Sequence, residues 1–267
     1  MSMKTSSSTF SEGSKLVISA SRRTDIPRWY SDWLLEQLGC GEVTYTRPGD
    51  GSKVSVPLHL DKVHSIVLWS KDFSRLLSNR ELVTRLEVYN LYFLLTITGL
   101  GGSIIEPRAP HPFQALQQMG QLADMFGAER INWRFDPIIY WHDDGKGCNN
   151  LALFPALAEK VAQIGVKRCT FSFAAWYKKC QRRVKKAGIE FIDPNDEQKL
   201  ESLYSLVEIA SSYGISLFSC AQDQWLKVPG VKRSSCIDGA FLTELHPQHA
   251  PAPGGKDKSQ RKQCGCT

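Results

Sequence analysis

The sequence lacks the short motifs that mark several common classes of enzyme. No Gly-x-Gly-x-x-Gly follows a strand-like segment, and Gly-x-x-x-x-Gly-Lys-Ser/Thr, His-Glu-x-x-His and Gly-x-Ser-x-Gly are absent. These motifs bind dinucleotides, cradle phosphates, hold catalytic zinc or present a nucleophilic serine, so the sequence supports none of those chemistries. Its six histidines show no metal-ligand spacing, and none is a candidate catalytic base.

Long hydrophobic runs are missing as well. The longest, Leu91 to Ile97, is far shorter than the roughly 20 apolar residues that cross a bilayer. The N-terminal residues 1–14 are rich in Ser and Thr and have no apolar segment of the signal-peptide kind. We therefore expect a disordered N-terminus over 1–14 and a soluble, cytoplasmic protein that does not bind membranes.

Eight cysteines occur in 267 residues. Cytosolic redox buffers keep thiols reduced, so metal ligands or free thiols explain these cysteines better than disulfides do. Four of them, Cys220, Cys236, Cys264 and Cys266, fall in the last fifth of the chain, the last two as a Cys-x-Cys pair. Thiolates gathered in this way hold zinc or an iron–sulfur cluster. The alternative is four unrelated thiols, because Cys is often simply buried.

The charge balance is mildly basic, with 33 Lys and Arg against 27 Asp and Glu and a net charge of +6. Part of the excess lies in a helix-like stretch, Lys178 to Lys186, and part near the C-terminus between Lys256 and Lys262. Such stretches are either solvated surfaces or contacts for nucleic acid or phosphate. Charge alone does not identify the partner.

Strand-like and helix-like segments alternate along the chain. Six strands are predicted to start at Leu16, Ser65, Tyr92, Arg130, Arg168 and Ile215, with helices between most of them, including 112–126, 151–164 and 196–213. This order favours an α/β fold, a partial or distorted (β/α) barrel of about six parallel strands, with an accessory hairpin over 43–60. A doubly wound open sheet is the alternative. We expect a single domain over 15–246 and an extended, basic, Cys-containing tail over 247–267.

Polar side chains follow the predicted strands, where loops of parallel α/β folds converge on one face. They are Arg22, Arg23 and Asp25 after the first strand, Lys71 after the second, Glu106 beyond the third, and Arg134 and Asp136 on the fourth. Guanidinium and ammonium groups would hold an anionic substrate, so Arg22, Arg23, Lys71 and Arg134 are candidate binding residues. Asp25, Glu106 and Asp136 are candidate acids or bases. Salt bridges among these same residues are the competing explanation.

Seven short segments in a fixed order resemble a bacterial family of unknown function, the one numbered 1848. They are Ile18-Ser-Ala-Ser-Arg-Arg-Thr-Asp-Ile-Pro, Val67-Leu-Trp-Ser-Lys-Asp, Thr96-Ile-Thr-Gly with Ile105-Glu-Pro, Trp133-Arg-Phe-Asp-Pro-Ile, Phe218-Ser-Cys-Ala, Cys236-Ile-Asp and Cys264-Gly-Cys. Members of that family look like relatives of radical S-adenosylmethionine enzymes with the cysteine cluster at the C-terminus. The resemblance implies a barrel-like, iron–sulfur-associated enzyme and no particular substrate.

Family members continue past the Cys-x-Cys pair into a segment with further cysteines, whereas this sequence ends at Thr267. The resemblance thus implies a truncated chain that does not perform radical chemistry alone, with S-adenosylmethionine as a cofactor only if that segment is present. Cys220, Cys236, Cys264 and Cys266 match family positions and remain the predicted metal ligands. The alternative function is a nucleic-acid-binding module with a structural zinc site, using the basic helix and tail.

Overall fold

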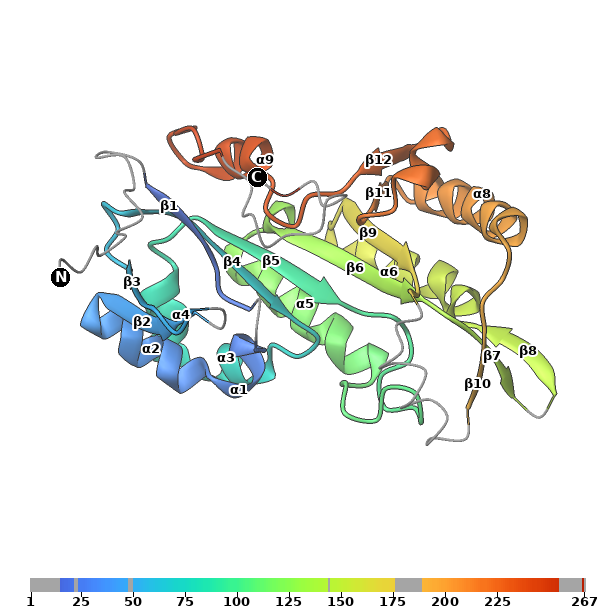
Figure 1. Cartoon of the computed structure of the whole chain (residues 1–267), viewed down its shortest axis with the longest axis horizontal. Coiled ribbons are helices and arrows are strands. Elements are labelled where there is room, and N and C mark those ends of the chain that lie inside the picture. Colours follow the sequence, from blue (N-terminus) through green and yellow to red (C-terminus); the bar gives the residue numbers. More distant parts are fainter. Residues whose placement is uncertain are drawn as a thin grey trace.

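The centre of the structure is a seven-stranded, entirely parallel sheet (Figure 1). The computed structural model describes residues 15–21, 24–47, 50–143, 145–175, 189–254 and 266. Across the sheet the strands run in chain order: β1 (Leu16–Ser19), β4 (Val63–Ser70), β5 (Leu91–Thr96), β6 (Ile131–Ile138), β9 (Arg168–Phe173), β11 (Ser216–Ser219) and β12 (Val231–Arg233). The six predicted parallel strands are all present.

The sheet is open, so the predicted closure toward a barrel is not confirmed. β1 and β12 form its two edges and do not pair with each other in the described part of the chain. The seventh strand, β12, was not predicted because its three residues are too short to show a pattern. Strands in chain order need crossovers that all run the same way, and right-handed crossovers then place their helices on the same face.

Helices cover one face of this sheet, and α5 and α6 lie behind it in Figure 1. The helices are α1 (Ile26–Trp29), α2 (Ser31–Cys40), α3 (Ser74–Ser78), α4 (Arg80–Leu86), α5 (Pro112–Phe126), α6 (Phe154–Ile164), α8 (Asp196–Ser212) and α9 (Gly239–Leu245). Helix α5 has the predicted bounds because its start is marked twice, by Pro112 in the first turn and by a capping box between His111 and Gln114.

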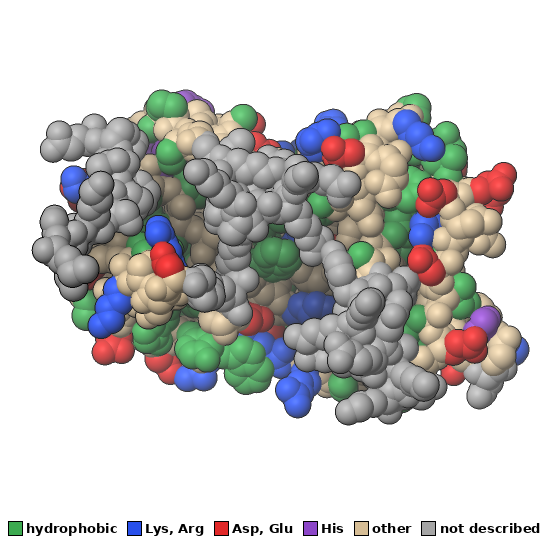
Figure 2. Space-filling view, in the orientation of Figure 1, with side chains coloured by type: hydrophobic (Ala, Val, Ile, Leu, Met, Phe, Trp, Pro, Cys, Tyr) green, Lys and Arg blue, Asp and Glu red, His purple; other side chains and the backbone are tan. Residues whose placement is uncertain are grey.

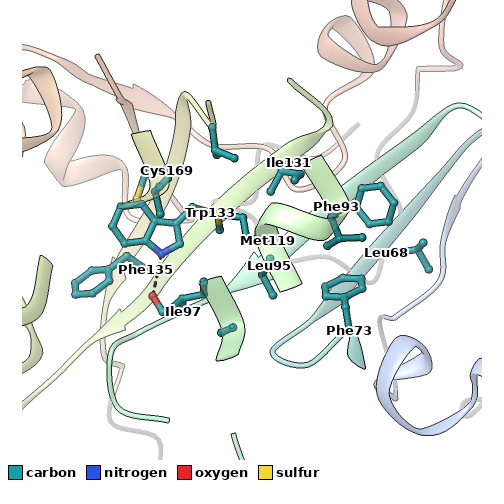
Figure 3. Close-up of a cluster of buried hydrophobic side chains, with 14 of the residues drawn as sticks. Leu68, Phe73, Phe93, Leu95, Ile97, Met119, Ile131, Trp133, Phe135 and Cys169 are labelled. Carbon is teal, nitrogen blue, oxygen red and sulfur yellow. Dashed lines mark hydrogen bonds between the residues drawn. The ribbon is translucent and has the colours of Figure 1, made fainter. Parts of the chain in front are cut away.

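The main core lies between the sheet and the helices of its covered face, which are those above other than α9 (Figure 3). Strand side chains that point to this face are large and apolar, for example Phe93, Leu95 and Trp133, and all three are fully buried. Trp133 stacks on Phe154 of α6 and donates its indole N–H to the carbonyl of Ile97 at 2.9 Å. The alternation of apolar residues along the strands therefore determines which face receives the helices.

A second, smaller cluster covers part of the opposite face, here called the α9 face. Leu242 and Leu245 of α9 pack on Val67, Tyr92 and Leu94 of the central strands. Helix α9 follows the last strand, so the C-terminal part of the chain crosses back over the sheet toward β4 and β5. The rest of this face carries polar side chains, which are described below.

Two small antiparallel sheets complete the fold. The predicted hairpin is confirmed as β2 (Glu42–Thr46) paired with β3 (Lys53–Pro57). A three-stranded sheet of β10 (Glu190–Ile192), β7 (Tyr140–Asp143) and β8 (Lys146–Asn149) was not predicted. Strands β7 and β8 form a tight hairpin, but each has only four residues, and β10 is short and lies far from both in sequence. The predicted basic helix, the N-terminal residues 1–14 and most of the tail lie outside the described residues. No helix within the described ranges is long and apolar enough to span a membrane.

Candidate functional site

A cluster of polar side chains lies on the α9 face at the carboxyl ends of the central strands. Trp69 of β4, Arg134 and Asp136 of β6 and Ser172 of β9 alternate with core residues and so point away from the helix-covered face. Figure 2 views the molecule from this side and shows a hollow near its centre where hydrophobic and basic side chains are visible. Carboxyl ends of parallel strands are where ligands usually bind in α/β folds.

Arg134 is the centre of this cluster. Its side chain is only 1% exposed, and its guanidinium lies 4.3 Å from the centre of the Trp69 ring. One terminal nitrogen donates to the carboxylate of Asp136, which also accepts a hydrogen bond from the Ser172 hydroxyl. The Nε atom is buried without a hydrogen-bond partner among the described residues. A buried guanidinium needs a negatively charged partner nearby, and the carboxylate of Asp136 is one such partner.

Sulfur atoms surround the rest of the guanidinium. Arg134 donates to the Sγ of Cys236 at 3.1 Å and lies 3.7 Å from the Sγ of Cys220. The thiol of Cys236 is also in hydrogen-bonding contact with those of Cys220 and Cys266. Three cysteines separated by up to 46 positions therefore meet at one place.

The sulfur of Cys266 lies in a pocket of backbone N–H groups. It accepts hydrogen bonds from the backbone N–H of Cys236 at 3.1 Å and of Ile237 at 3.3 Å, and the residue is buried. Hydrogen bonds from N–H groups to sulfur stabilise a thiolate and are among the contacts that tune protein-bound iron–sulfur clusters.

The surroundings of the cluster shift the pKa values of the Arg134 guanidinium and of the cysteine thiols. Burial alone would lower the pKa of Arg134, but Asp136 and the sulfurs of Cys236 and Cys220 raise that pKa by more, so Arg134 stays charged. The hydrogen bond with Cys236, followed by burial, raises the pKa of Cys220. For Cys236 the contact with Cys220 lowers the pKa, but the contact with Cys266 and burial together raise it. Without a bound metal, the thiols of Cys220 and Cys236 are therefore neutral.

The segment that carries Cys236 is held to the sheet by Arg168 at the start of β9. The Arg168 guanidinium lies 4.2 Å from the ring centre of Phe218 in β11 and 3.9 Å from that of Phe241 in α9. It also pairs with Asp238, the N-cap of α9, at 3.5 Å. These contacts attach α9 to β9 and β11 and so position the neighbouring cysteine against Arg134.

The other predicted acidic and basic residues form separate pairs at the rim. Asp25 accepts from the Ser70 hydroxyl at 2.8 Å and from the backbone N–H of Arg28 at 3.2 Å. Burial raises the pKa of Asp25, and those two hydrogen bonds oppose the rise. Lys71 pairs with Glu106 at 2.6 Å.

The structure thus brings together five of the predicted site residues, Arg134, Asp136, Cys220, Cys236 and Cys266. Asp25, Lys71 and Glu106 lie in their own pairs, while Arg22, Arg23 and Cys264 lie outside the described residues. Sequence reasoning did not assign a role to Trp69 or Ser172, which contact Arg134 and Asp136 directly. Their positions at the ends of β4 and β9, on the same face as Arg134, were the available signal.

The chain matches one known protein family over most of its length. The profile of the family described as Domain of unknown function (DUF1848) matches residues 17–267. The chain belongs to this family. The match includes every element of the large sheet and all four C-terminal cysteines, and so agrees with the resemblance seen in the short segments. A search of curated proteins finds no match.

The family description names no cofactor, so the fit of a metal group rests on the residues themselves. In the described part of the chain, no group of three or more His, Cys, Asp or Glu side chains is arranged to hold a metal ion. The donor chemistry nonetheless suits a thiolate-bound metal, because three sulfurs are in contact, Cys266 already accepts two N–H groups, and Arg134 keeps one buried N–H without a partner. The donor types of these residues therefore fit an anionic metal–thiolate group.

Proposed function

We propose that this DUF1848 chain is the core of an enzyme whose chemistry depends on an iron–sulfur cluster or a zinc ion held by Cys220, Cys236, Cys266 and Cys264. The observation that carries the proposal is the buried Arg134 guanidinium in contact with the sulfurs of Cys220 and Cys236. A neutral thiol is a weak partner for a buried cation, whereas thiolates on a metal would satisfy it.

The charge of Arg134 is also of the right sign to hold a metal–thiolate group. Four thiolates give a bound zinc ion, or a cluster of the usual oxidation states, a net negative charge. Arg134 is the one described cation that contacts these sulfurs, and its other terminal contact is to the carboxylate of Asp136. Arg134 would therefore hold the anionic group electrostatically, while the N–H groups of Cys236 and Ile237 would orient the sulfur of Cys266.

The resemblance to radical S-adenosylmethionine enzymes favours iron–sulfur over zinc within this proposal. An iron–sulfur cluster at this place would supply electrons to a substrate bound at the carboxyl edge of the sheet. The strand order of the large sheet, which puts its crossovers on one face, leaves the other face free for such a site.

The protein's own residues would divide the remaining tasks. Trp69 lies over Arg134 and excludes water from its guanidinium. Asp136, between Arg134 and the Ser172 hydroxyl, holds both in place and is the candidate acid or base nearest the sulfurs. Asp25 and Glu106 remain candidate acids or bases at the rim, and Arg22, Arg23 and Lys71 remain candidates for binding an anionic substrate.

Metal and sulfide analysis of protein purified without oxygen tests the proposal. We expect iron with acid-labile sulfide in the wild-type chain and a large loss of both in Cys236→Ser. Cys40→Ser is the matched control, because Cys40 is exposed on α2 and distant in sequence from the cluster. Zinc without sulfide would keep the zinc form of the proposal and rule out the iron–sulfur form, and a wild-type chain without either metal would refute the proposal.

The alternative function, a nucleic-acid-binding module with structural zinc, rests on the basic helix and the basic tail. Both lie outside the described residues, so no described contact favours it over the enzyme. It stays a prediction, and steeply salt-dependent binding to a random-sequence oligonucleotide would be its signature.

A further inference from the structure

A polar groove lies on the other side of the strand-end loops, between α1, the segment 108–110 and helix α5. Its volume is about 690 Å³, within the size range of small-molecule sites. Neither Arg134 nor any cysteine of the described residues lines it. In the same region, the surface over α1 and α2 shows exposed hydrophobic side chains beside basic ones (Figure 2), and Trp29 and Tyr30 are 55% and 46% exposed.

One wall of the groove is the exposed polar face of helix α5. Gln114, Gln117, Gln121 and Asp124 recur at spacings of three and four residues, so they form a polar stripe along the helix. The side chains of Gln117, Gln121 and Asp124 have no hydrogen-bond or ion-pair partner within the described residues. The stripe is therefore a row of amide and carboxylate groups open to a ligand.

Gly120 lies in the middle of α5 and also lines the groove. Glycine inside a helix is less favourable than alanine, because its backbone loses more conformational entropy when the helix forms. Packing does not require it here, because a Cβ atom added at Gly120 would meet no atom within 4 Å. Because Gly120 has no side chain, the helix backbone is accessible from the groove at this point, and a ligand can approach it closely.

The end of the groove nearest the start of α5 carries two guanidinium groups, Arg28 and Arg108, and one carboxylate, Asp72. Arg28 is fixed there by Asp72, 3.6 Å away, and by a hydrogen bond to the carbonyl of Arg108. The guanidinium of Arg108 itself is exposed and has no partner in the described part of the chain. The first turn of the 15-residue helix α5 adds its partial positive charge at the same end.

We infer that this groove binds a phosphorylated ligand of nucleotide size, with its phosphate at Arg108 and Arg28 and its polar remainder along Gln117, Gln121 and Asp124. A guanidinium is the side chain best suited to phosphate, and carboxamides pair with the donors and acceptors of bases and sugars. Hydroxyl or amino groups at the far end of the ligand would donate to Asp124. The inference does not depend on the cysteine site, which the groove does not include.

Calorimetric titration of the full chain tests this inference. The probes are the four common nucleoside monophosphates, with adenosine alone and inorganic phosphate alone as partial ligands. At least one monophosphate should bind more tightly than both partial ligands, and Arg108→Met should weaken it by about tenfold or more. If no monophosphate binds more tightly than phosphate alone, the inference is wrong.

Gly120→Ala gives a test that misfolding cannot imitate. Because alanine favours the helix and meets no atom, we expect this variant to raise the unfolding temperature by about 2 °C. We expect the same variant to weaken monophosphate binding severalfold, because its methyl group enters the groove. Gly39→Ala is the matched control, since Gly39 lies in α2, also has no atom within 4 Å of its added Cβ, and does not line the groove.

The two variants separate the possible results. Stabilisation by both, with weaker binding only for Gly120→Ala, supports the groove as the binding site. Unchanged binding in Gly120→Ala would show that the ligand binds elsewhere and would overturn the inference. Metal content should be the same in all these variants, so failure here leaves the proposed cysteine site unaffected.

Discussion

The two faces of the large sheet differ in what they bury. The helix-covered face buries aromatic and aliphatic side chains such as Trp133 and Phe93, which contact others of the same kind. The α9 face buries a charged guanidinium at Arg134 and a hydrogen-bonded layer of Asn132, Thr170 and Ser234. Apolar contacts tolerate many arrangements, whereas each buried polar group needs a specific partner. The difference indicates that the first face stabilises the fold and the second is built around specific contacts.

Removing the largest side chain of the helix-covered face should have the largest effect. Trp133→Ala removes a fully buried indole that stacks on Phe154, and such truncations cost about 4 kcal/mol of unfolding free energy. Denaturant unfolding of wild type and variant measures it. Trp33→Ala, at an exposed position of α2, is the control and should cost much less. A loss under about 1 kcal/mol for Trp133→Ala would show that this face repacks easily.

Removing the charge from the α9 face should have the next largest effect. Arg134→Met leaves Asp136 without its cation, and breaking a buried pair in this way costs about 3 kcal/mol. The exposed pair of Arg75 and Asp32 gives the contrast, because Arg75→Met should leave the unfolding free energy close to that of wild type. Both are read from unfolding curves of metal-free protein. Equal stability of Arg134→Met and wild type would mean that water replaces Arg134 as the hydrogen-bond partner of Asp136, and that solvent reaches this site.

The polar layer beneath Arg134 should be sensitive to the loss of one hydroxyl. Thr170→Val keeps the shape but removes the partner of Asn132, at 2.9 Å, and of Ser234, at 3.2 Å. Leaving buried polar groups unpaired should cost about 1–2 kcal/mol. Thr84→Val on the exposed surface of α4 should stay within about 0.5 kcal/mol of wild type. If the two variants behave alike, the layer does not contribute through hydrogen bonds.

The smallest effect should appear as a pH dependence where α9 ends. The ring of His246 lies 4.8 Å from that of His64, and Lys15, His249 and Arg130 are further basic neighbours. Burial, followed by these charges, lowers the pKa of His246 below its ordinary value of 6.5. The unfolded chain then binds the proton first, so stability should be constant above about pH 6.5 and fall as pH decreases toward the folded pKa.

Unfolding free energies measured between about pH 8 and pH 5 test this, with His246→Gln as the variant that cannot titrate. The slope below the ordinary pKa should be smaller in His246→Gln than in wild type. Identical slopes would mean that the titration of His246 does not contribute to the pH dependence of stability and that other groups account for it.

The sequence alone predicted the elements whose signals are local. Helix α5 was placed with its observed bounds because Pro112 and the capping box are read from adjacent residues. Six strands of the large sheet followed from short apolar runs between predicted helices, and the β2–β3 hairpin followed from alternation of apolar and polar residues around a turn. The three-residue strands β12 and β10 were missed, since they pair with segments far away in the sequence, and the β7–β8 hairpin was missed because its four-residue strands are too short to show a clear alternation.

For the site, the sequence by itself determined which residue types were available: cysteines, an Arg and an Asp two positions apart on one strand, and acidic and basic groups after other strands. Only the tertiary structure decided that the thiols of Cys220, Cys236 and Cys266 meet around Arg134, while Asp25 and Glu106 pair elsewhere. The physical reason is that strand order and the return of α9 across the sheet set these contacts. Both arise from packing and pairing between segments far apart in the chain, which no local pattern records.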